Sequence, residues 1–119
     1  MHNYDEMTQE ELREFIFNDE DWWECYQATK RLTDQPSLEE VALNHNHRGV
    51  RAIATSRLIK QETLKRIALN KNESSDVRVE AVMCLIDPET LKEIALKEKD
   101  GSVSFKAIIR LSELGQPLQ

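Results

Sequence analysis

The chain has 119 residues, of which 39% are hydrophobic and 32% are charged, with only three Gly and three Pro. A chain of this length can bury a core without disulfide or metal support. The few Gly and Pro exclude a Gly/Pro-punctuated all-β fold, and the apolar fraction excludes a disordered chain. We therefore expect one helix-rich domain over residues 1–119.

The sequence carries no membrane or secretion signal. No apolar run approaches the roughly 20 residues that span a bilayer, and the segment Met1 to Glu14 is polar and acidic rather than basic followed by apolar. Cys25 and Cys84 lie far apart and outside any CxxC or Cys/His spacing. Two reduced thiols in a reducing compartment are the simplest interpretation, which predicts a cytoplasmic protein.

Charge is unevenly distributed along the chain. Residues 1–40 hold twelve Asp/Glu against three Lys/Arg, a balance of −9, whereas residues 41–119 hold ten against thirteen, a balance of +3. The acidic third disfavours non-specific binding of nucleic acid. The remainder leaves open an anion-binding surface built from a local basic cluster. Its members are Arg48, Arg51, Arg57, Lys60, Lys65 and Arg66.

An internal repeat organises the rest of the chain. Three segments beginning at Leu38, Leu64 and Leu91 align almost without gaps, with a period of 26 or 27 residues. The second stretch of each segment has apolar residues at i, i+4 and i+8, the spacing of one helix face, so two helices per repeat are predicted. The aligned apolar positions are Leu38/Leu64/Leu91, Ala42/Ala68/Ala95, Leu43/Leu69/Leu96, Val50/Val77/Val103, Ala54/Ala81/Ala107 and Leu58/Leu85/Leu111.

These alignments predict an all-α, right-handed α-α superhelix of about four helical hairpins. The three repeats cover residues 37–61, 62–86 and 87–115, and residues 8–34 form a divergent N-terminal capping hairpin in which Leu12, Ala28 and Leu32 occupy the repeat positions.

Polar and special residues mark the expected ends of the helices. Capping boxes are predicted at Thr8 with Glu11 and at Ser37 with Glu40. Asp87 followed by Pro88 predicts an N-cap, and Gly115 before Pro117 predicts the end of the last helix.

The motifs Val50-Arg51-x-x-Ala54-x-x-x-Leu58 and Val77-Arg78-x-x-Ala81-x-x-x-Leu85 resemble those of the HEAT-like repeat family, in particular the short bacterial phycobilisome-lyase type. The resemblance covers about two thirds of the chain. The variant leucine-rich repeat is a rival with a similar signature, but it looks shorter in period and uses a 3₁₀ segment in place of the second helix. In the last repeat, Ser104 replaces the arginine.

The aligned arginines Arg51 and Arg78 are candidate contacts for phosphates or carboxylates. The resemblance implies an alternative, structural role, in which such an arginine bonds a loop or an acidic residue of the adjacent unit.

One position beyond the arginines runs a second apolar stripe, for which we predict either packing within the repeats or a partner-binding surface. Its candidate partner-binding residues are Val79, Met83, Phe105 and Ile109.

Trp22 and Trp23 add a further candidate surface within an acidic segment. Adjacent helical residues point about 100° apart, so we expect one tryptophan in the core and the other partly exposed. An exposed Trp ringed by carboxylates favours a basic or amphipathic partner, although both rings filling the core remains an alternative.

His45-Asn46-His47 supplies two potential nitrogen ligands for a metal ion, which is fewer than a zinc site requires. No metal, cofactor or catalytic site is therefore predicted, and the sequence contains no phosphate loop, GxSxG or HExxH motif.

The expected function is a non-catalytic scaffold that binds another protein or a second copy of itself. Two alternatives stay open. One is a nucleic-acid binder that uses the basic cluster around Arg48–Arg66. The other is an enzyme subunit of the lyase type, since the family resemblance includes bilin lyase subunits. The related alkylpurine DNA glycosylases look too long and too basic for this chain.

Overall fold

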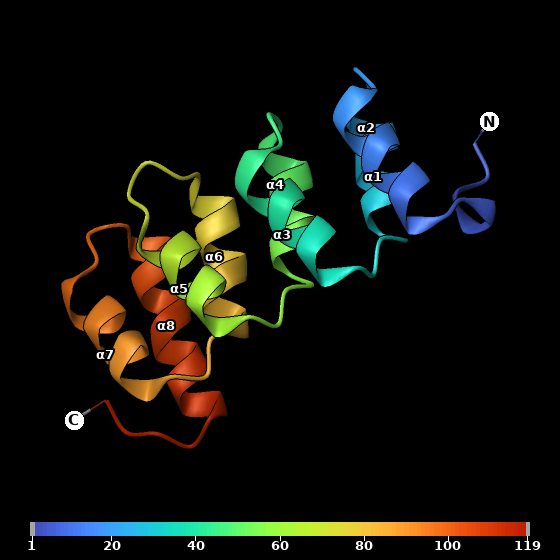
Figure 1. The fold of residues 1–119 in the computed structure, drawn as a ribbon. Helices are drawn as coiled ribbons and strands as arrows, with labels where there is room; N and C mark the ends of the chain where they lie inside the picture. Colours follow the sequence, from blue (N-terminus) through green and yellow to red (C-terminus); the bar gives the residue numbers. More distant parts are fainter. Residues whose placement is uncertain (1, 119) are drawn as a thin grey trace. The chain divides into compact units, whose positions relative to one another are not determined.

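A computed structural model describes residues 2–118 of the chain. Over this range it holds eight α-helices, one short 3₁₀ helix and no strand, so the prediction of an all-α fold is confirmed (Figure 1). The 3₁₀ helix covers Tyr4–Glu6. The α-helices are α1 Gln9–Asn18, α2 Trp22–Thr29, α3 Gln35–Asn44, α4 Arg48–Thr55, α5 Gln61–Leu69, α6 Ser75–Cys84, α7 Pro88–Lys97 and α8 Gly101–Glu113.

The helices group into two compact units, residues 1–58 and residues 59–119. In the first unit, α1 packs on α2, α3 on α4, and the two hairpins meet through α2–α4 and α1–α3 contacts. In the second unit, α5 packs on α6, α7 on α8, and α6 packs on α8. Each unit is thus a pair of stacked helical hairpins.

The repeat positions identified in the sequence form the core of both units. Leu38, Leu64 and Leu91 are buried. The aligned valine and alanine of each second helix are buried as well, and so are the aligned leucines, although Leu58 and Leu85 lie just beyond the ends of α4 and α6. Leu12, Ala28 and Leu32 fill the corresponding positions of the first hairpin. The period-26 alignment therefore identified the residues that each hairpin buries.

Two aligned positions do not behave as core. Ala95 is only half-buried, and the series Leu43, Leu69 and Leu96 runs from half-buried to 66% exposed at Leu96. Leu96 lies five residues after Leu91 and two after Ile94 on α7, so its side chain points about 140° or more away from those two buried side chains.

The predicted helix ends are confirmed at three places. Thr8 and Glu11 form a reciprocal capping box before α1. Asp87 caps α7 with Pro88 in its first turn. Gly115 takes φ 69°, and the hydrogen bonds from its N–H to Ser112 O and from Gln116 N–H to Leu111 O complete a Schellman-type end to α8.

The predicted capping box at Ser37 and Glu40 is wrong. Helix α3 begins three residues earlier, at Gln35, because the carboxylate of Asp34 accepts the Ser37 N–H at 3.1 Å and acts as the N-cap. Glu40 instead binds Arg13 of α1 through two hydrogen bonds.

A row of glutamines, which the sequence alignment missed, connects the two helices within each of three hairpins. Gln9, Gln35 and Gln61 each open the first helix of a hairpin and lie 26 residues apart. Their side-chain amides donate to carbonyls near the end of the second helix, namely Arg31 O, Arg57 O and Cys84 O. The sequence did contain a signal for this row, because the glutamines recur with the same period of 26 residues as the apolar positions.

Candidate functional site

Arg78, one of the two candidate anion contacts, is buried inside the second unit. The residue is only 3% exposed, and its Nε donates a hydrogen bond to Ala68 O at 3.0 Å. Its guanidinium also forms a hydrogen-bonded ion pair with Glu98, the C-cap of α7. This hydrogen bond lowers the pKa of the Glu98 carboxyl. Arg78 therefore joins the hairpins α5–α6 and α7–α8 and is inaccessible to an external phosphate.

Arg51, the other candidate, lies half-buried on α4. One of its terminal nitrogens donates to His45 O at 2.8 Å, in the turn between α3 and α4. Arg57 of the basic cluster similarly donates to the main-chain carbonyls of Thr29 and Lys30. These side chains therefore have structural partners of their own.

The apolar stripe lies on two helices that pack against each other, α6 and α8. Met83 is 45% and Phe105 is 62% exposed, whereas Val79 and Ile109 are half-buried. Ile108, which the sequence analysis did not select, is also exposed. Large apolar side chains with this exposure, one turn apart on adjoining helices, are typical of a contact surface.

Trp22 and Trp23 are both exposed, at 45% and 51%, so the expectation that one of them fills the core is wrong. Helix α2 buries Cys25, Ala28 and Thr29 instead, which lie on the face turned toward the other helices of the unit. Trp22 stacks on His47 with ring centroids 4.5 Å apart and planes 1° apart, and Trp23 stacks on Tyr26.

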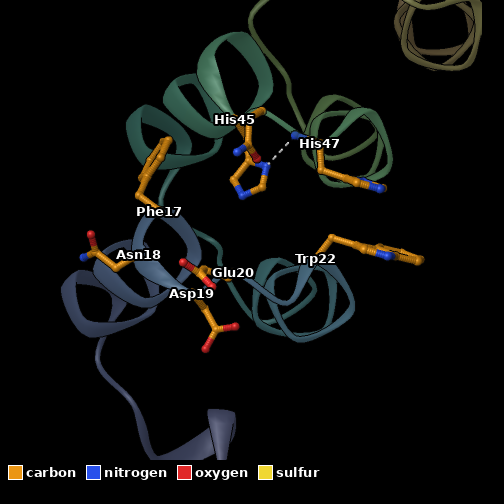
Figure 2. Close-up of a pocket in the computed structure, with 8 residues that line it drawn as sticks. Phe17, Asn18, Asp19, Glu20, Trp22, His45 and His47 are labelled. Atoms are coloured by element: carbon orange, nitrogen blue, oxygen red, sulfur yellow. Dashed lines mark hydrogen bonds between the residues drawn. The ribbon is translucent and has the colours of Figure 1, made fainter.

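A pocket of about 450 Å³ opens beside Trp22 in the first unit. It lies where the turn between α1 and α2 meets the turn between α3 and α4, and it is lined by residues 17–20, Trp22 and residues 45–47. Figure 2 shows His45 between Phe17 on one side and the stacked Trp22 and His47 on the other.

His45 holds the two turns of the pocket together. It is 6% exposed, its Nε2 lies 3.0 Å from Ile16 O, and its Nδ1 accepts the main-chain N–H of His47 at 3.0 Å (Figure 2). A carbonyl can only accept, so this network assigns the proton to Nε2. Burial lowers the pKa of His45, which keeps the ring neutral at pH 7.

His47 is the N-cap of α4, and its Nδ1 accepts the N–H of Gly49 at 3.0 Å. A Cβ at position 49 would lie only 3.0 Å from the His47 ring, so a larger residue there would force the capping ring to shift. Both nitrogens of His45 and Nδ1 of His47 are thus engaged. The two histidines cannot supply a pair of metal ligands in this geometry, and no group of three metal-binding side chains occurs within residues 2–118.

Two carboxylates, Asp19 and Glu20, give the pocket its charge, and its lining contains no lysine or arginine. Asp19 Oδ1 accepts the N–H of Asp21 at 2.8 Å, which fixes the turn between α1 and α2. The site therefore combines negative charge with the exposed indole of Trp22.

The two thiols are poor nucleophiles in this fold. Cys25 is fully buried, and burial together with Asp19 raises its pKa to about 11. The pKa of the half-buried Cys84 is raised as well, mainly by burial. Neither thiol forms a thiolate readily near pH 7.

No helix within residues 2–118 has both the length and the apolar character needed to span a membrane. Compared with known proteins, the chain matches no family model, no curated protein and no solved structure.

Proposed function

We propose that this chain is a non-catalytic protein-binding scaffold of the HEAT-like repeat type. One observation carries the proposal. Met83 and Phe105 expose about half of their surface on adjoining helices, α6 and α8, whose core residues Val77, Ala81, Val103 and Ala107 are buried. Exposed apolar side chains of this size cost solubility, and a partner that covers them would recover the free energy of burial.

The form of the surface suits a helical partner. Val79 and Met83 lie one turn apart on α6, and Phe105 and Ile109 lie one turn apart on α8. Two such rows on adjoining helices form a ridged apolar surface that an amphipathic helix can cover with its own i, i+4 residues. Met83 adds an adaptable side chain to this surface.

The proposal includes the way in which the hairpins associate. We propose that the four hairpins continue as one right-handed α-α superhelix, because the same positions are buried in every hairpin and the same glutamine recurs at the start of three of them. Small-angle X-ray scattering would test this arrangement, since a continuous superhelix has one elongated shape, whereas two independently moving units give a broad distribution of sizes.

The alternatives have less support. Arg51 and Arg57 of the basic cluster donate to main-chain carbonyls, which leaves fewer of their N–H groups for phosphates. The raised pKa values of Cys25 and Cys84 do not favour nucleophilic catalysis by either thiol.

The decisive experiment compares Phe105→Ser with Leu96→Ser. Both side chains are about two-thirds exposed and belong to the second unit, but Leu96 lies on α7, outside the stripe. We expect the free energy of unfolding of both variants to lie within about 1 kcal/mol of that of the original chain. Affinity capture from the native cell extract should lose its specific partner with Phe105→Ser and keep it with Leu96→Ser.

Light scattering at several protein concentrations decides whether the partner is a second copy of the chain. A concentration-dependent dimer that Phe105→Ser abolishes would identify self-association as the function of the stripe. A large loss of stability in Phe105→Ser would contradict the proposal, since the side chain would then belong to the core.

A further inference from the structure

We infer that the pocket beside Trp22 is a binding site for an arginine side chain of a partner peptide. The inference deepens the proposed function, on which it rests, by naming the chemistry of a partner. The site itself lies in the first unit and uses none of the residues of the apolar stripe.

Charge is the first argument. Asp19 and Glu20 line the pocket together with a neutral His45, and no lysine or arginine lines it. Two guanidinium groups lie near the lining. That of Arg13 lies 5.5 Å from the centroid of the Phe17 ring and is held by two hydrogen bonds to Glu40, and that of Arg51 donates to the main-chain carbonyl of His45. Asp19 and Glu20 thus give the lining two formal negative charges, within a unit that holds twelve Asp/Glu and six Lys/Arg. A cation is the complementary ligand.

The aromatic wall is the second argument. Trp22 is held flat against His47, so its orientation is fixed before any ligand arrives. Its indole nevertheless keeps 45% of its surface exposed. His47 covers one face of the ring, and the Trp23 ring lies at 87° to it with centroids 5.7 Å apart, so a cation would contact the indole surface that these two neighbours leave exposed.

The rigidity of the pocket is the third argument. His45 bonds Ile16 O on one side and the His47 main chain on the other, and His47 in turn caps α4 through Gly49. Asp19 Oδ1 is fixed by the Asp21 N–H. The floor and both rims are therefore formed in the free protein, and ligand binding would order few additional side chains.

These features favour arginine over lysine. The guanidinium group is planar, weakly hydrated and able to stack on an aromatic ring while it donates several hydrogen bonds to carboxylates. Lysine offers a strongly hydrated point charge and gains less from a shallow, open site. The volume of about 450 Å³ exceeds that of one side chain, so residues flanking the arginine have room beside it.

The test uses fluorescently labelled peptides on the intact chain, followed by fluorescence anisotropy at low and moderate salt. The probe is a short Gly/Ser peptide with two arginines. Its matched controls carry lysine or citrulline at the same positions, since citrulline keeps the shape of arginine and removes the charge. We expect saturable binding of the arginine peptide, weaker binding of the lysine peptide and none of the citrulline peptide.

Two double variants with the same net charge identify the site. Asp19→Asn with Glu20→Gln should weaken binding by about tenfold or more, whereas Glu6→Gln with Glu10→Gln should change it by less than about twofold. The control residues lie near the start of α1, about 15 Å along the helix from its pocket end. Trp22→Leu, at a largely exposed position, should also weaken binding while the helical circular dichroism signal is kept.

Equal losses in the two double variants would show diffuse electrostatic attraction and overturn the inference. Binding of the citrulline peptide, or the absence of any saturable binding, would do the same. Binding of free arginine as tightly as the peptide would assign the pocket to the amino acid and reject the peptide as its ligand.

The outcome is separable from that of the proposed function. Phe105→Ser should bind the arginine peptide normally, because Phe105 belongs to the second unit. If no peptide binds but Phe105→Ser still loses its cellular partner, only the pocket assignment is wrong. If the peptide binds as expected and Phe105→Ser keeps every partner, the stripe as the binding surface is wrong.

Discussion

The two units bury the same repeat positions but present different surfaces. Residues 1–58 hold twelve Asp/Glu against six Lys/Arg, whereas residues 59–119 hold ten of each. The acidic unit exposes Trp22 and Trp23 at one edge, and the neutral unit exposes Met83 and Phe105 along two helices. The repeat therefore constrains the residues that stack hairpins together and leaves the outer surfaces free to diverge.

The units also differ in how their turns are fixed. In the first unit, the turn between α3 and α4 is held to α1 by the neutral ring of His45, with Arg51 bound to the His45 carbonyl. In the second unit, the ion pair of Arg78 and Glu98 connects α6 to the end of α7. Arg51 and Arg78, which occupy the same position of the repeat, thus take part in two different hydrogen-bond networks. Three measurements test this difference between the units.

The largest effect is expected at the buried ion pair. Arg78→Met leaves the carboxylate of Glu98 buried without its partner, because both side chains are less than a tenth exposed. Urea unfolding should show a loss of about 3–5 kcal/mol. The double variant Arg78→Met with Glu98→Leu should recover part of that loss, since it removes both buried charges.

An additive double variant would contradict this account, because it would mean that Arg78 and Glu98 do not interact. Arg13→Met serves as the comparison in the acidic unit. Its partner Glu40 remains partly exposed to water when left alone, so the loss should be clearly smaller than for Arg78→Met.

A smaller effect is expected from the glutamine row. In Gln61→Ala, the Cys84 carbonyl loses a donor and the Ile86 N–H loses an acceptor, and the Gln9→Ala variant frees the N–H groups of Thr33 and Asp34 in the same way. Each change should cost about 0.5–1.5 kcal/mol of unfolding free energy. Gln116→Ala, outside the row, is the control and should have no measurable effect. Unequal losses of stability in Gln9→Ala and Gln61→Ala would show that the glutamines do not stabilise the two units in the same way.

The smallest effect is a pH dependence that arises from His45 in the acidic unit. Burial, with the charges of His47 and Arg51, lowers the pKa of His45 below that of an unfolded histidine, which is about 6.5. The unfolded chain therefore binds the proton first as the pH falls, so stability is complete above pH 6.5 and decreases below it.

Urea unfolding between pH 7 and 5 should show this decrease, and His45→Gln should flatten it. His2→Asn is the control and should keep the slope of the original chain. The carboxyls of Glu40, Asp87, Glu98 and Asp100 have lowered pKa values, so their contributions are lost only at more acidic pH. An unchanged slope in His45→Gln would show that His45 does not titrate in this range.

Several parts of the candidate sites were accessible from the sequence. Phe105 and Met83 were selected because other apolar residues already occupy the core positions of their helices, so a second apolar stripe needs burial of its own, either within the repeats or under a partner. The tryptophans were selected for their acidic surroundings. The pocket itself was not predictable, because its two rims come from turns more than 20 residues apart, and only folding brings His47 onto Trp22.

By itself, the sequence determined the helical class, the two-helix period and the buried positions, because burial of one helix face repeats with the geometry of the helix. The tertiary structure decided the roles of the polar side chains. Arg78 forms a buried ion pair with Glu98, and the neutral ring of His45 connects two turns. Glu40 binds Arg13 and does not cap a helix. A polar group takes whichever partner the fold brings within hydrogen-bond distance, and that choice depends on contacts between segments distant in sequence.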